Sequence, residues 1–372
     1  MGRHERWGSI AQMVLKKERA MFTFKERTYV ATIPRDVEAI LAGDIGGTNC
    51  NFGIFQLVDG ELSLLFSVHF KSQEITNFTD VIKQVLAHVQ TAYQITIKKA
   101  CLAAAGVVDP ERHYSKPTNL PFIIDTQEIK KVSGLACVML ANDFEVIGYG
   151  LDRIDPKDLV KVKEGKEKQK ANKASLGAGT GLGKCILLWD HHRGYYVPVA
   201  SEGGHADLAA RSELELELIA FIQNLEHKSC AISWEDVLSG YGIQRLYKFF
   251  RHKNKKIKAN EFLEKNGLHP DEIFNNRHLD QHSWNTFELY SRFYARCAKN
   301  FALDALALGG VYIAGGIAAK NLHLFEERGF LDEFLNCGKQ QALLRDIPIY
   351  VITDYNISLY GAAEYLRLEE LY

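Results

Sequence analysis

The sequence lacks the features that mark several common protein classes. Its seven cysteines among 372 residues are all isolated, with no C-x-x-C pair, which argues against a zinc ribbon or a disulfide framework and for thiols in a reducing compartment. The longest apolar run, residues 305–319, is broken by glycines and is shorter than the ~20 residues of a membrane span. A net charge of −1 provides no field that attracts nucleic acid or anionic lipid. The N-terminus lacks the apolar core of a secretion signal, so we expect a cytoplasmic protein.

Apolar residues are plentiful, at 47% of the chain, and indicate a globular protein of one large or two ordinary domains. Two segments differ from the rest. Residues 1–37 have an excess of basic residues and a weakly amphipathic pattern, which we interpret as an appended helix or a partly ordered extension. Residues 161–173 are rich in lysine, and we interpret the segment as a solvated surface loop with no role in nucleic-acid binding.

The most informative stretch is a glycine-rich turn between two predicted strands. Residues 41–49 read Leu-Ala-Gly-Asp-Ile-Gly-Gly-Thr-Asn, and a second strand follows from Cys50 to Leu57. Glycines let the backbone bend and approach a ligand, and the N–H groups of such a turn can bind phosphate oxygens. Asp44 directly follows the first strand, so its carboxylate could reach a metal-bound ligand. The alternative is a plain glycine-rich hairpin without a ligand.

A second strand–turn–strand pattern contains Gly-Ala-Gly-Thr-Gly-Leu-Gly at residues 177–183. It matches neither the G-x-G-x-x-G nor the Walker template, and we interpret Lys184 as a solvated strand residue and not as a phosphate-binding lysine. The two turns indicate a weak internal duplication. Two such hairpins facing each other across a cleft could hold a polyphosphate from both sides.

Further candidate residues follow strands or begin helices. Asp143 ends a predicted buried strand, at the edge where α/β proteins bind ligands, so it could accept a proton from a substrate hydroxyl or could simply cap a helix. The turn 201–205 brings an acid, Glu202, and an imidazole, His205, together as a possible clamp for hydroxyls. Glu235 lies at a predicted helix start, where a helix-dipole role competes with a ligand role.

Six segments of the sequence resemble, in their order and spacing, motifs of the bacterial glucokinase family, within the hexokinase and actin-like ATPase superfamily. The resemblance runs from about residue 39 to residue 367. It rests on Gly-Asp-Ile-Gly-Gly-Thr-Asn (43–49), Asn-Asp-Phe (142–144), Gly-Ala-Gly-Thr-Gly-Leu-Gly (177–183), Glu-Gly-Gly-His (202–205), Glu-Asp-Val-Leu-Ser-Gly (235–240) and Gly-Gly-Val-Tyr-Ile-Ala-Gly-Gly-Ile (309–317). The related repressor/kinase group has a cysteine zinc cluster after its histidine, which this sequence lacks.

The resemblance implies a role for each matching residue. Asp143 would be the catalytic base, and Asp44 would act on Mg²⁺ through the phosphates. The ATP-binding residues would be Gly43, Asp44, Ile45, Gly46, Gly47, Thr48, Gly179, Thr180, Gly181, Gly315 and Gly316. The sugar-binding residues would be Asn119, Asn142, Asp143, Glu202, His205 and Glu235.

The resemblance also implies an α/β fold of the two-domain actin-like ATPase (ribonuclease H-like) type, with a cleft between the domains. Residues 1–37 would be an extension, residues 38–150 plus 355–372 a small domain, and residues 151–354 a large domain. The implied activity is ATP-dependent phosphorylation of the 6-hydroxyl of glucose at the entry to glycolysis, by a homodimer. The alternatives are a kinase for another hexose or amino sugar, a catalytically weak sugar sensor, and an actin-like assembling ATPase.

Overall fold

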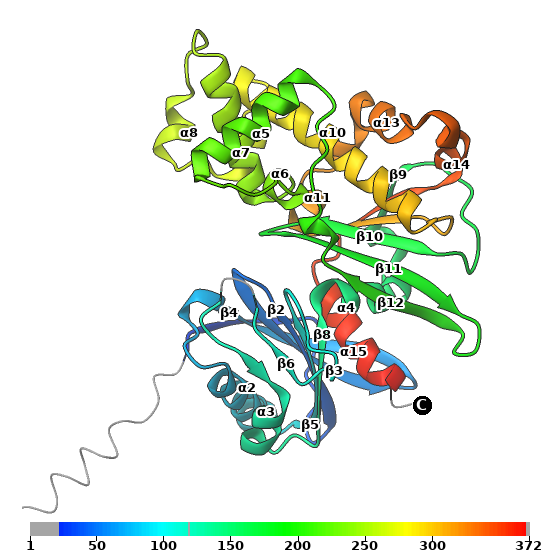
Figure 1. Cartoon of the computed structure of the whole chain (residues 1–372). Helices are drawn as coiled ribbons and strands as arrows, with labels where there is room; N and C mark the ends of the chain where they lie inside the picture. The colour runs from blue at the N-terminus through cyan, green and yellow to red at the C-terminus, as the bar shows by residue number, and fades with distance from the viewer. Residues whose placement is uncertain (1–21, 118–119, 370–372) are drawn as a thin grey trace, which may run out of the picture.

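The computed structural model describes residues 22–117 and 120–369, which form two six-stranded sheets (Figure 1). Each sheet packs against its own set of helices, and two further helices, α4 and α15, lie between the sheets (Figure 1). The helical pattern expected in the first 21 residues and the candidate Asn119 lie outside the described residues.

The first sheet has the order β1-β4-β3-β2-β5-β8. Its strands are β1 (Phe24–Thr28), β2 (Glu38–Ile45), β3 (Asn49–Val58), β4 (Glu61–Lys71), β5 (Thr96–Ala104) and β8 (Cys137–Asn142). Strands β2, β5 and β8 are parallel, so their C-terminal ends meet at one edge. Strand β1 was not expected, because its residues alternate poorly. It pairs with the edge of β4, and Phe24 packs on Phe70 with ring centres 5.5 Å apart.

Helices cover both faces of this sheet. On one face lie α2 (Phe78–Tyr93) and α3 (Thr126–Ser133), and on the other α4 (Asp143–Gly150) and α15 (Ile357–Glu369). Helix α2 buries an apolar stripe that recurs at helical spacing, formed by Phe78, Val81, Ile82, Val85 and Val89. A small ribbon of β6 (Tyr114–Ser115) and β7 (Ile124–Asp125) precedes α3.

The second sheet has the order β12-β11-β10-β13-β14-β9. Its strands are β9 (Leu159–Lys163), β10 (Lys173–Ala178), β11 (Leu182–Asp190), β12 (Tyr195–Ser201), β13 (Val311–Ala314) and β14 (Ile349–Ile352). In both sheets an antiparallel three-stranded meander is followed by two parallel strands. The internal duplication that the two glycine turns indicated is therefore confirmed by the topology.

Two expectations about lysines need correction. Residues 164–170 of the lysine-rich segment are exposed and lie outside any strand, as expected, but the segment begins in strand β9, which pairs with β14, and ends at the start of β10. Lys163 is buried, and its ammonium donates to three backbone carbonyl oxygens at 2.9 Å or less. Carbonyl groups left over at chain turns and helix ends can bind a cation in this way, which the sequence did not reveal. Lys184 is also buried, with its ammonium 5.2 Å from the centre of the Phe301 ring.

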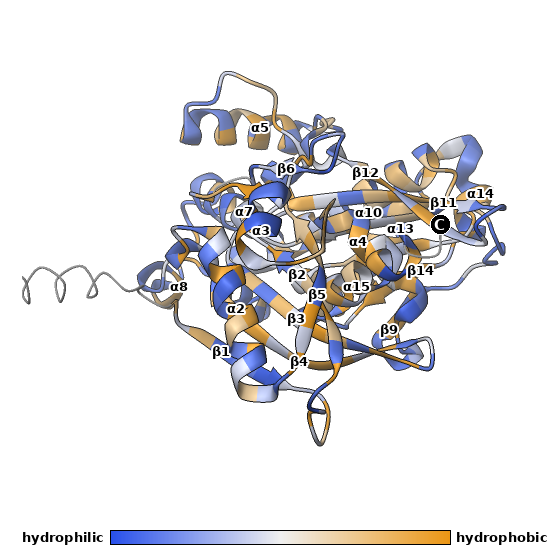
Figure 2. Ribbon diagram, turned by 90° about the horizontal axis from the view of Figure 1, so that it is seen from below, coloured by the Kyte–Doolittle hydropathy of each residue, from blue (hydrophilic) through white to orange (hydrophobic). Residues whose placement is uncertain are grey.

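The remaining helices cover the face of the second sheet that points away from α4. They are α5 (Glu213–Glu226), α6 (Trp234–Val237), α7 (Gly240–Lys253), α8 (Glu261–Lys265), α9 (Pro270–Asn275), α10 (Gln281–Asp304), α11 (Gly316–Lys320), α12 (His323–Glu326), α13 (Arg328–Leu335) and α14 (Gln341–Asp346). The long α10 packs against α7, α9, α12 and α13 and forms the centre of this core. Figure 2 shows hydrophobic residues concentrated along the strands, with hydrophilic residues on the outer loops.

Helices α4 and α15 cross at very short range because glycines face the contact. A β-carbon on Gly361 would lie 1.7 Å from the carbonyl oxygen of Val146, and one on Gly150 would lie 2.7 Å from that of Ile357. Helix α4 also contacts β11 and β12 of the second sheet. It therefore touches both halves of the molecule, and the residue at its N-terminus lies where they meet.

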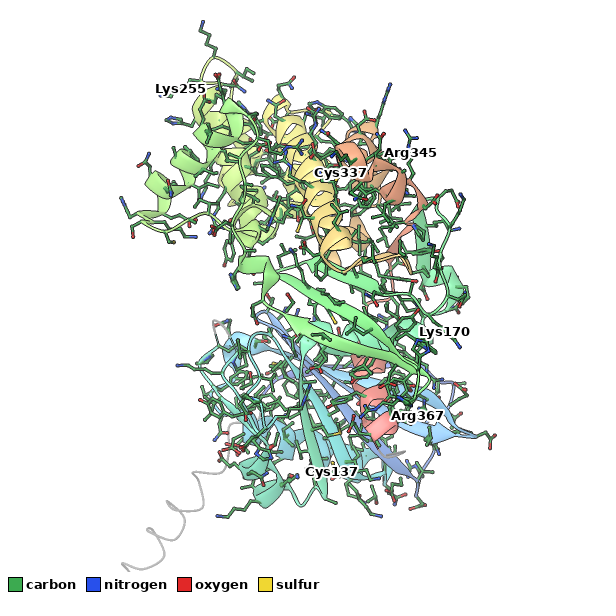
Figure 3. All side chains as sticks on the ribbon, turned by 45° about the vertical axis from the view of Figure 1, so that its right-hand side comes forward. Cys137, Lys170, Lys255, Cys337, Arg345 and Arg367 are labelled. Carbon is green, nitrogen blue, oxygen red and sulfur yellow. The ribbon has the colours of Figure 1, made fainter. Side chains whose placement is uncertain are left out.

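None of the helices in the described ranges is long and apolar enough to cross a membrane. All seven cysteines carry free thiols, as the isolated positions predicted. Figure 3 shows Cys137 in the first sheet and Cys337 among the helices at the opposite end of the molecule.

Candidate active site

The site begins where β8 ends and α4 starts. Asn142 is the N-cap: its Oδ1 accepts from the N–H groups of Phe144 and Glu145 at 2.9 and 3.2 Å. Glu145 completes a capping box by accepting from the backbone N–H of Asn142. Because Asn142 makes the cap, Asp143 is not needed for it. The Asp143 side chain is partly exposed, and its Oδ1 accepts from the N–H of Phe144 at 2.9 Å.

Asp143 is positioned by its neighbour Phe144, which packs on two glycines of the second sheet. Gly177 and Gly183 lie opposite each other in the β10–β11 pair. A β-carbon on Gly183 would lie 1.9 Å from Cδ2 of the Phe144 ring, and one on Gly177 would lie 2.9 Å from its Cζ. These glycines of the second motif therefore provide a flat surface for the start of α4. The sequence pattern suggested that a ligand approaches these two glycines, but in the structure the Phe144 ring occupies the space next to them.

Three carboxylates converge at this point. Burial raises the pKa of Asp143 to about 7, and the negative charges of Asp44 and Glu202 raise it further. Burial also raises the pKa of Asp44 to about 6, against the opposing effect of a hydrogen bond from Asn51. Titratable groups with strongly shifted pKa values in a cleft are typical of functional sites. Asp44, Asp143 and Glu202 come from different strand ends, and the structure brings them together.

The first glycine turn, residues 44–48, is held from behind by residues that follow β4. The Ser72 hydroxyl donates to the Gly46 carbonyl at 2.6 Å, and the Gln73 amide donates to the Gly47 carbonyl at 3.2 Å. The N–H of Ser72 donates to the Thr48 carbonyl. In a planar trans peptide the next N–H points opposite to the carbonyl, so the amides after these carbonyls face away from Ser72. Sequence reasoning missed this support, which had no motif to signal it.

The two glycine turns meet across the cleft. The hydroxyl oxygens of Thr48 and Thr180 lie 3.3 Å apart. Glu235, at the start of α6, accepts from the N–H of Leu182 at 2.9 Å, and a β-carbon on Gly181 would lie 2.5 Å from the same carboxylate. Glu235 is therefore attached to the second turn in this structure, away from the residues that line the cavity beside Asn142.

Two cavities open near the strand-end carboxylates. One, of about 300 Å³, is lined by Asn142 and Glu202 together with the loop after β5, residues 106–112. The other, of about 400 Å³, is lined by Asp44, Gly315 and Gly316, along with residues from β1, β3, β4 and the start of α15. Asp143 lines neither cavity, but the negative charges of Asp44, which lines one, and of Glu202, which lines the other, both raise its pKa. Its carboxylate is therefore close to a residue of each cavity.

The turn after β12 completes the first cavity. Gly204 allows this turn to pack on the second glycine turn, since a β-carbon there would lie 1.9 Å from the Leu182 carbonyl oxygen. Glu202 and His205 lie at the exposed rim, with Nε2 of His205 3.8 Å from Oε2 of Glu202. Neither side chain is tightly held, so both can rearrange around a polar ligand.

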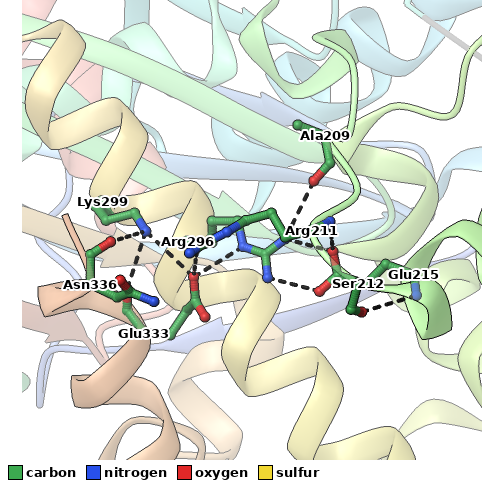
Figure 4. A network of polar contacts seen from close by, with 8 residues as sticks. All are labelled: Ala209, Arg211, Ser212, Glu215, Arg296, Lys299, Glu333 and Asn336. Carbon is green, nitrogen blue, oxygen red and sulfur yellow. Dashed lines mark hydrogen bonds and ion pairs between the residues drawn. The ribbon is translucent and has the colours of Figure 1, made fainter. Parts of the chain in front are cut away.

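A buried ion network fixes the chain that follows this turn (Figure 4). Arg296 of α10 donates to both carboxylate oxygens of Glu215 at 2.8 and 2.9 Å and to Glu333 at 3.1 Å. The same guanidinium donates to the Ala209 carbonyl, and the N–H of Arg211 donates to Glu215 (Figure 4). The network therefore ties the segment after the Glu202–His205 turn to α5, α10 and α13.

Comparison with known proteins gives consistent matches. The family model described as Glucokinase matches residues 41–369. A glucokinase of Nostoc punctiforme is 33% identical over 340 residues, covering 87% of this chain and 97% of the relative, and one of Pectobacterium atrosepticum is 30% identical over 333 residues, covering 88% and 97%. A crystal structure of glucokinase from an Antarctic psychrotroph is 28% identical with a TM-score of 0.73, covering 88% of this chain and 98% of that one.

The fold extends to more distant proteins. A ROK-family glucokinase from Streptomyces griseus, solved with glucose and AMPPNP, is 19% identical with a TM-score of 0.60 and covers 88% of this chain and 98% of its own. Duplicated sheets, opposed glycine turns and a strand-end aspartate in the cleft define the class: the two-domain actin-like ATPase fold, as expected. Within that class the chain belongs to the glucokinase family. The expected enzyme class, an ATP-dependent sugar kinase, is confirmed by the same matches.

Proposed function

We propose that the protein transfers the γ-phosphoryl group of ATP to the 6-hydroxyl of glucose, giving glucose 6-phosphate and ADP. The observation that carries this proposal is that the Asp143 carboxylate is within reach of the charges of both Glu202, which lines one cavity, and Asp44, which lines the other. A sugar hydroxyl in the first cavity and a nucleotide tail over the second would then meet at the same carboxylate.

Asp143 would act as the base. Its pKa of about 7 lies near neutral pH, so the carboxylate can accept the proton of the 6-hydroxyl and release it after the transfer. Phosphoryl transfer passes through a loose transition state, so most of the catalysis is positioning and neutralisation of charge. The contact between Phe144 and Gly183 supports the proposal, because it fixes the helix start that carries the base.

The nucleotide would be bound by both glycine turns. Residues 43–48 and 179–181 would surround the phosphates, with Thr48 and Thr180 on either side, and Gly315 and Gly316 would lie against the adenosine. The N–H groups of Gly46 and Gly179 already donate within their own turns, so the donors would be other amides of the two turns. The 3.3 Å contact between the two threonine hydroxyls supports a single phosphate-binding site shared by both turns. The support of the first turn by Ser72 also fits, since the N–H groups that follow the supported carbonyls point away from Ser72.

Asp44 would reach the phosphates through Mg²⁺. A carboxylate at a strand end suits this ion, which is usually held by one or two carboxylates and substrate phosphates. Among residues 22–117 and 120–369 no group of three His, Cys, Asp or Glu side chains could hold a metal by itself. Bound magnesium would offset the negative charge on the transferred group. Asp44 would orient the nucleotide tail towards Asp143.

The sugar would be bound by Asn119, Asn142, Asp143, Glu202, His205 and Glu235. One hydrogen of the Asn142 amide is used by the Gly106 carbonyl at 3.0 Å, which leaves the other for a ligand. Glu235 would have to release the second glycine turn. We propose that the small domain, residues 38–150 plus 355–372, closes on the large domain, residues 151–354, about the crossing of α4 and α15, and so excludes water from the reaction.

The test is an ADP-release assay of the purified protein with glucose, mannose, fructose, glucosamine and N-acetylhexosamines. Glucose is expected to give the highest kcat/KM, and a higher value with another sugar would favour the alternative hexose or amino-sugar kinase. Isothermal titration that shows sugar binding without ADP release would favour the sensor. Sedimentation of the protein on addition of ATP would favour an assembling ATPase.

We further propose that the protein is a homodimer and works in the cytoplasm. The seven free thiols support a reducing compartment. Light scattering of the purified protein is expected to give twice the mass of the chain, and a monomer mass at working concentration would contradict the dimer.

A further inference from the structure

A row of polar side chains crosses the first sheet and ends at Asp44. Asp44 on β2 is directly opposite Asn51 on β3, which is directly opposite His69 on β4. Asn51 donates a hydrogen bond to Asp44. Nδ1 of His69 lies 2.8 Å from Oδ1 of Asn51, and Nε2 of His69 lies 2.7 Å from the hydroxyl of Ser67.

The row continues into the extension and to the start of helix α15. The hydroxyl of Tyr29 lies 3.3 Å from that of Ser67 and 3.1 Å from Oδ1 of Asn356, and its single proton has to serve both oxygens because Ser67 gives its own proton to His69. Tyr29 follows strand β1, before the segment that the family model matches, and Asn356 immediately precedes α15. Members of this row, including Asp44, His69 and Tyr29, line the cavity on the Gly315 side.

The donors and acceptors of the row have one consistent direction. Burial, and then the charge of Arg27, lower the pKa of His69, so its imidazole is neutral at neutral pH. The Asn51 oxygen can only accept, so Nδ1 of His69 carries the proton and Nε2 accepts from Ser67. With its oxygen held by His69, Asn51 must turn its amide nitrogen to Asp44. Ser67 therefore donates to His69, His69 donates to Asn51, and Asn51 donates to the Asp44 carboxylate.

We propose that His69 is a positioning residue for the nucleotide: it orients Asn51 so that its amide holds the Asp44 carboxylate in the direction required by Mg·ATP, and strand β1 anchors the row through Tyr29. This inference rests on the proposed function. Without His69, Asn51 could flip its amide and present an oxygen to Asp44, which would repel the carboxylate.

The test compares two substitutions of His69 by isothermal titration and steady-state kinetics. His69→Phe removes the donor at Nδ1, whereas His69→Asn retains an N–H at the same position. Losing an oriented hydrogen bond to a charged group is expected to raise the Kd of Mg·AMPPNP and the KM of ATP by about tenfold in His69→Phe. The Kd of glucose should be unchanged, and His69→Asn should restore nucleotide affinity to within about threefold of wild type.

The extension is tested with a matched pair of tyrosines. Tyr29→Phe removes the hydroxyl that ends the row and should weaken Mg·AMPPNP binding by about two- to threefold. Tyr93→Phe removes a hydroxyl that donates to Glu26 of the same strand but on the opposite face of the sheet, and nucleotide binding should not change.

Several outcomes would overturn the inference. Unchanged nucleotide affinity in His69→Phe would refute it directly. Equal losses in His69→Phe and His69→Asn, or equal weakening of glucose and nucleotide, would show a role in folding only. A wild-type protein that binds neither Mg·AMPPNP nor glucose would instead contradict the proposed function itself.

Discussion

Replacing Asp143 by asparagine should make the enzyme nearly inactive and more stable at the same time. Asparagine keeps the shape of the side chain and an oxygen that can accept from the N–H of Phe144. It cannot accept the proton of a sugar hydroxyl. The loss of a positioned base is expected to lower kcat by about 10²–10⁴-fold.

The gain in stability follows from the pKa of Asp143. Burial, the charge of Asp44 and that of Glu202 raise this pKa from 3.8 to about 7 in the folded protein. Between these pH values the folded protein keeps a proton on Asp143 that the unfolded chain has lost. The free energy of unfolding therefore falls as the pH rises, and this loss of stability reaches its full size above about pH 7. The full shift corresponds to at most about 4 kcal/mol, and partial exposure reduces our expectation to about 1–2 kcal/mol.

The assay is chemical unfolding of wild type and Asp143→Asn at a series of pH values, with ADP release measured in parallel. The stability advantage of the variant should grow from about pH 4 to about pH 7 and then level off, because only the wild type ionises. In the wild type, kcat/KM for the sugar should rise with pH through about 7. Wild-type turnover in the variant, or a stability difference that does not change with pH, would refute the reasoning.

Three further substitutions test the supports of the site. Gly183→Ala should destabilise the fold by about 1–3 kcal/mol and lower kcat by about 10²-fold, because the new β-carbon displaces Phe144. Adding Phe144→Leu should recover part of the stability and part of kcat. No recovery in the double variant would contradict the contact between Gly183 and Phe144. Arg112→Met removes two hydrogen bonds to the buried carboxylate of Glu145 and should lower the free energy of unfolding in urea by about 1–3 kcal/mol. Arg112→Lys should lower it less. An unchanged free energy of unfolding in Arg112→Met would show that Glu145 needs no partner. Arg296→Met should cost about 3–5 kcal/mol by the same measurement, because it leaves buried carboxylates unpaired, and a loss below about 1 kcal/mol would contradict the network.

Much of the site could be predicted from the sequence, because its signals are local. Glycines at 43, 46 and 47 mark a turn wherever the chain folds, and apolar runs that end in a polar residue mark buried strands. The pair Asp59–Gly60, between β3 and β4, is typical of a two-residue hairpin turn, and both residues have positive φ in the structure, 51° and 85°. The order of the six motifs was enough to expect the family and its fold, which the matches confirm.

Other features depended on residues that meet only after folding. The sequence left open whether Asp143 caps α4, and the structure assigns the cap to Asn142 because its side chain reaches the first N–H groups of the helix. The burial of Lys163 and Lys184 needed acceptors and a ring from distant segments. Strand β1 needed the free edge of β4.

The chain by itself therefore determined which residues are reactive and where the backbone bends, since both are properties of neighbouring residues. Only the tertiary structure decided how those residues are held. Phe144 meets Gly183, and Asn51 connects Asp44 to His69, through strand pairing and helix packing between segments far apart in the chain. Such contacts leave no periodic or local signal, because each partner alone is an ordinary residue in its own segment.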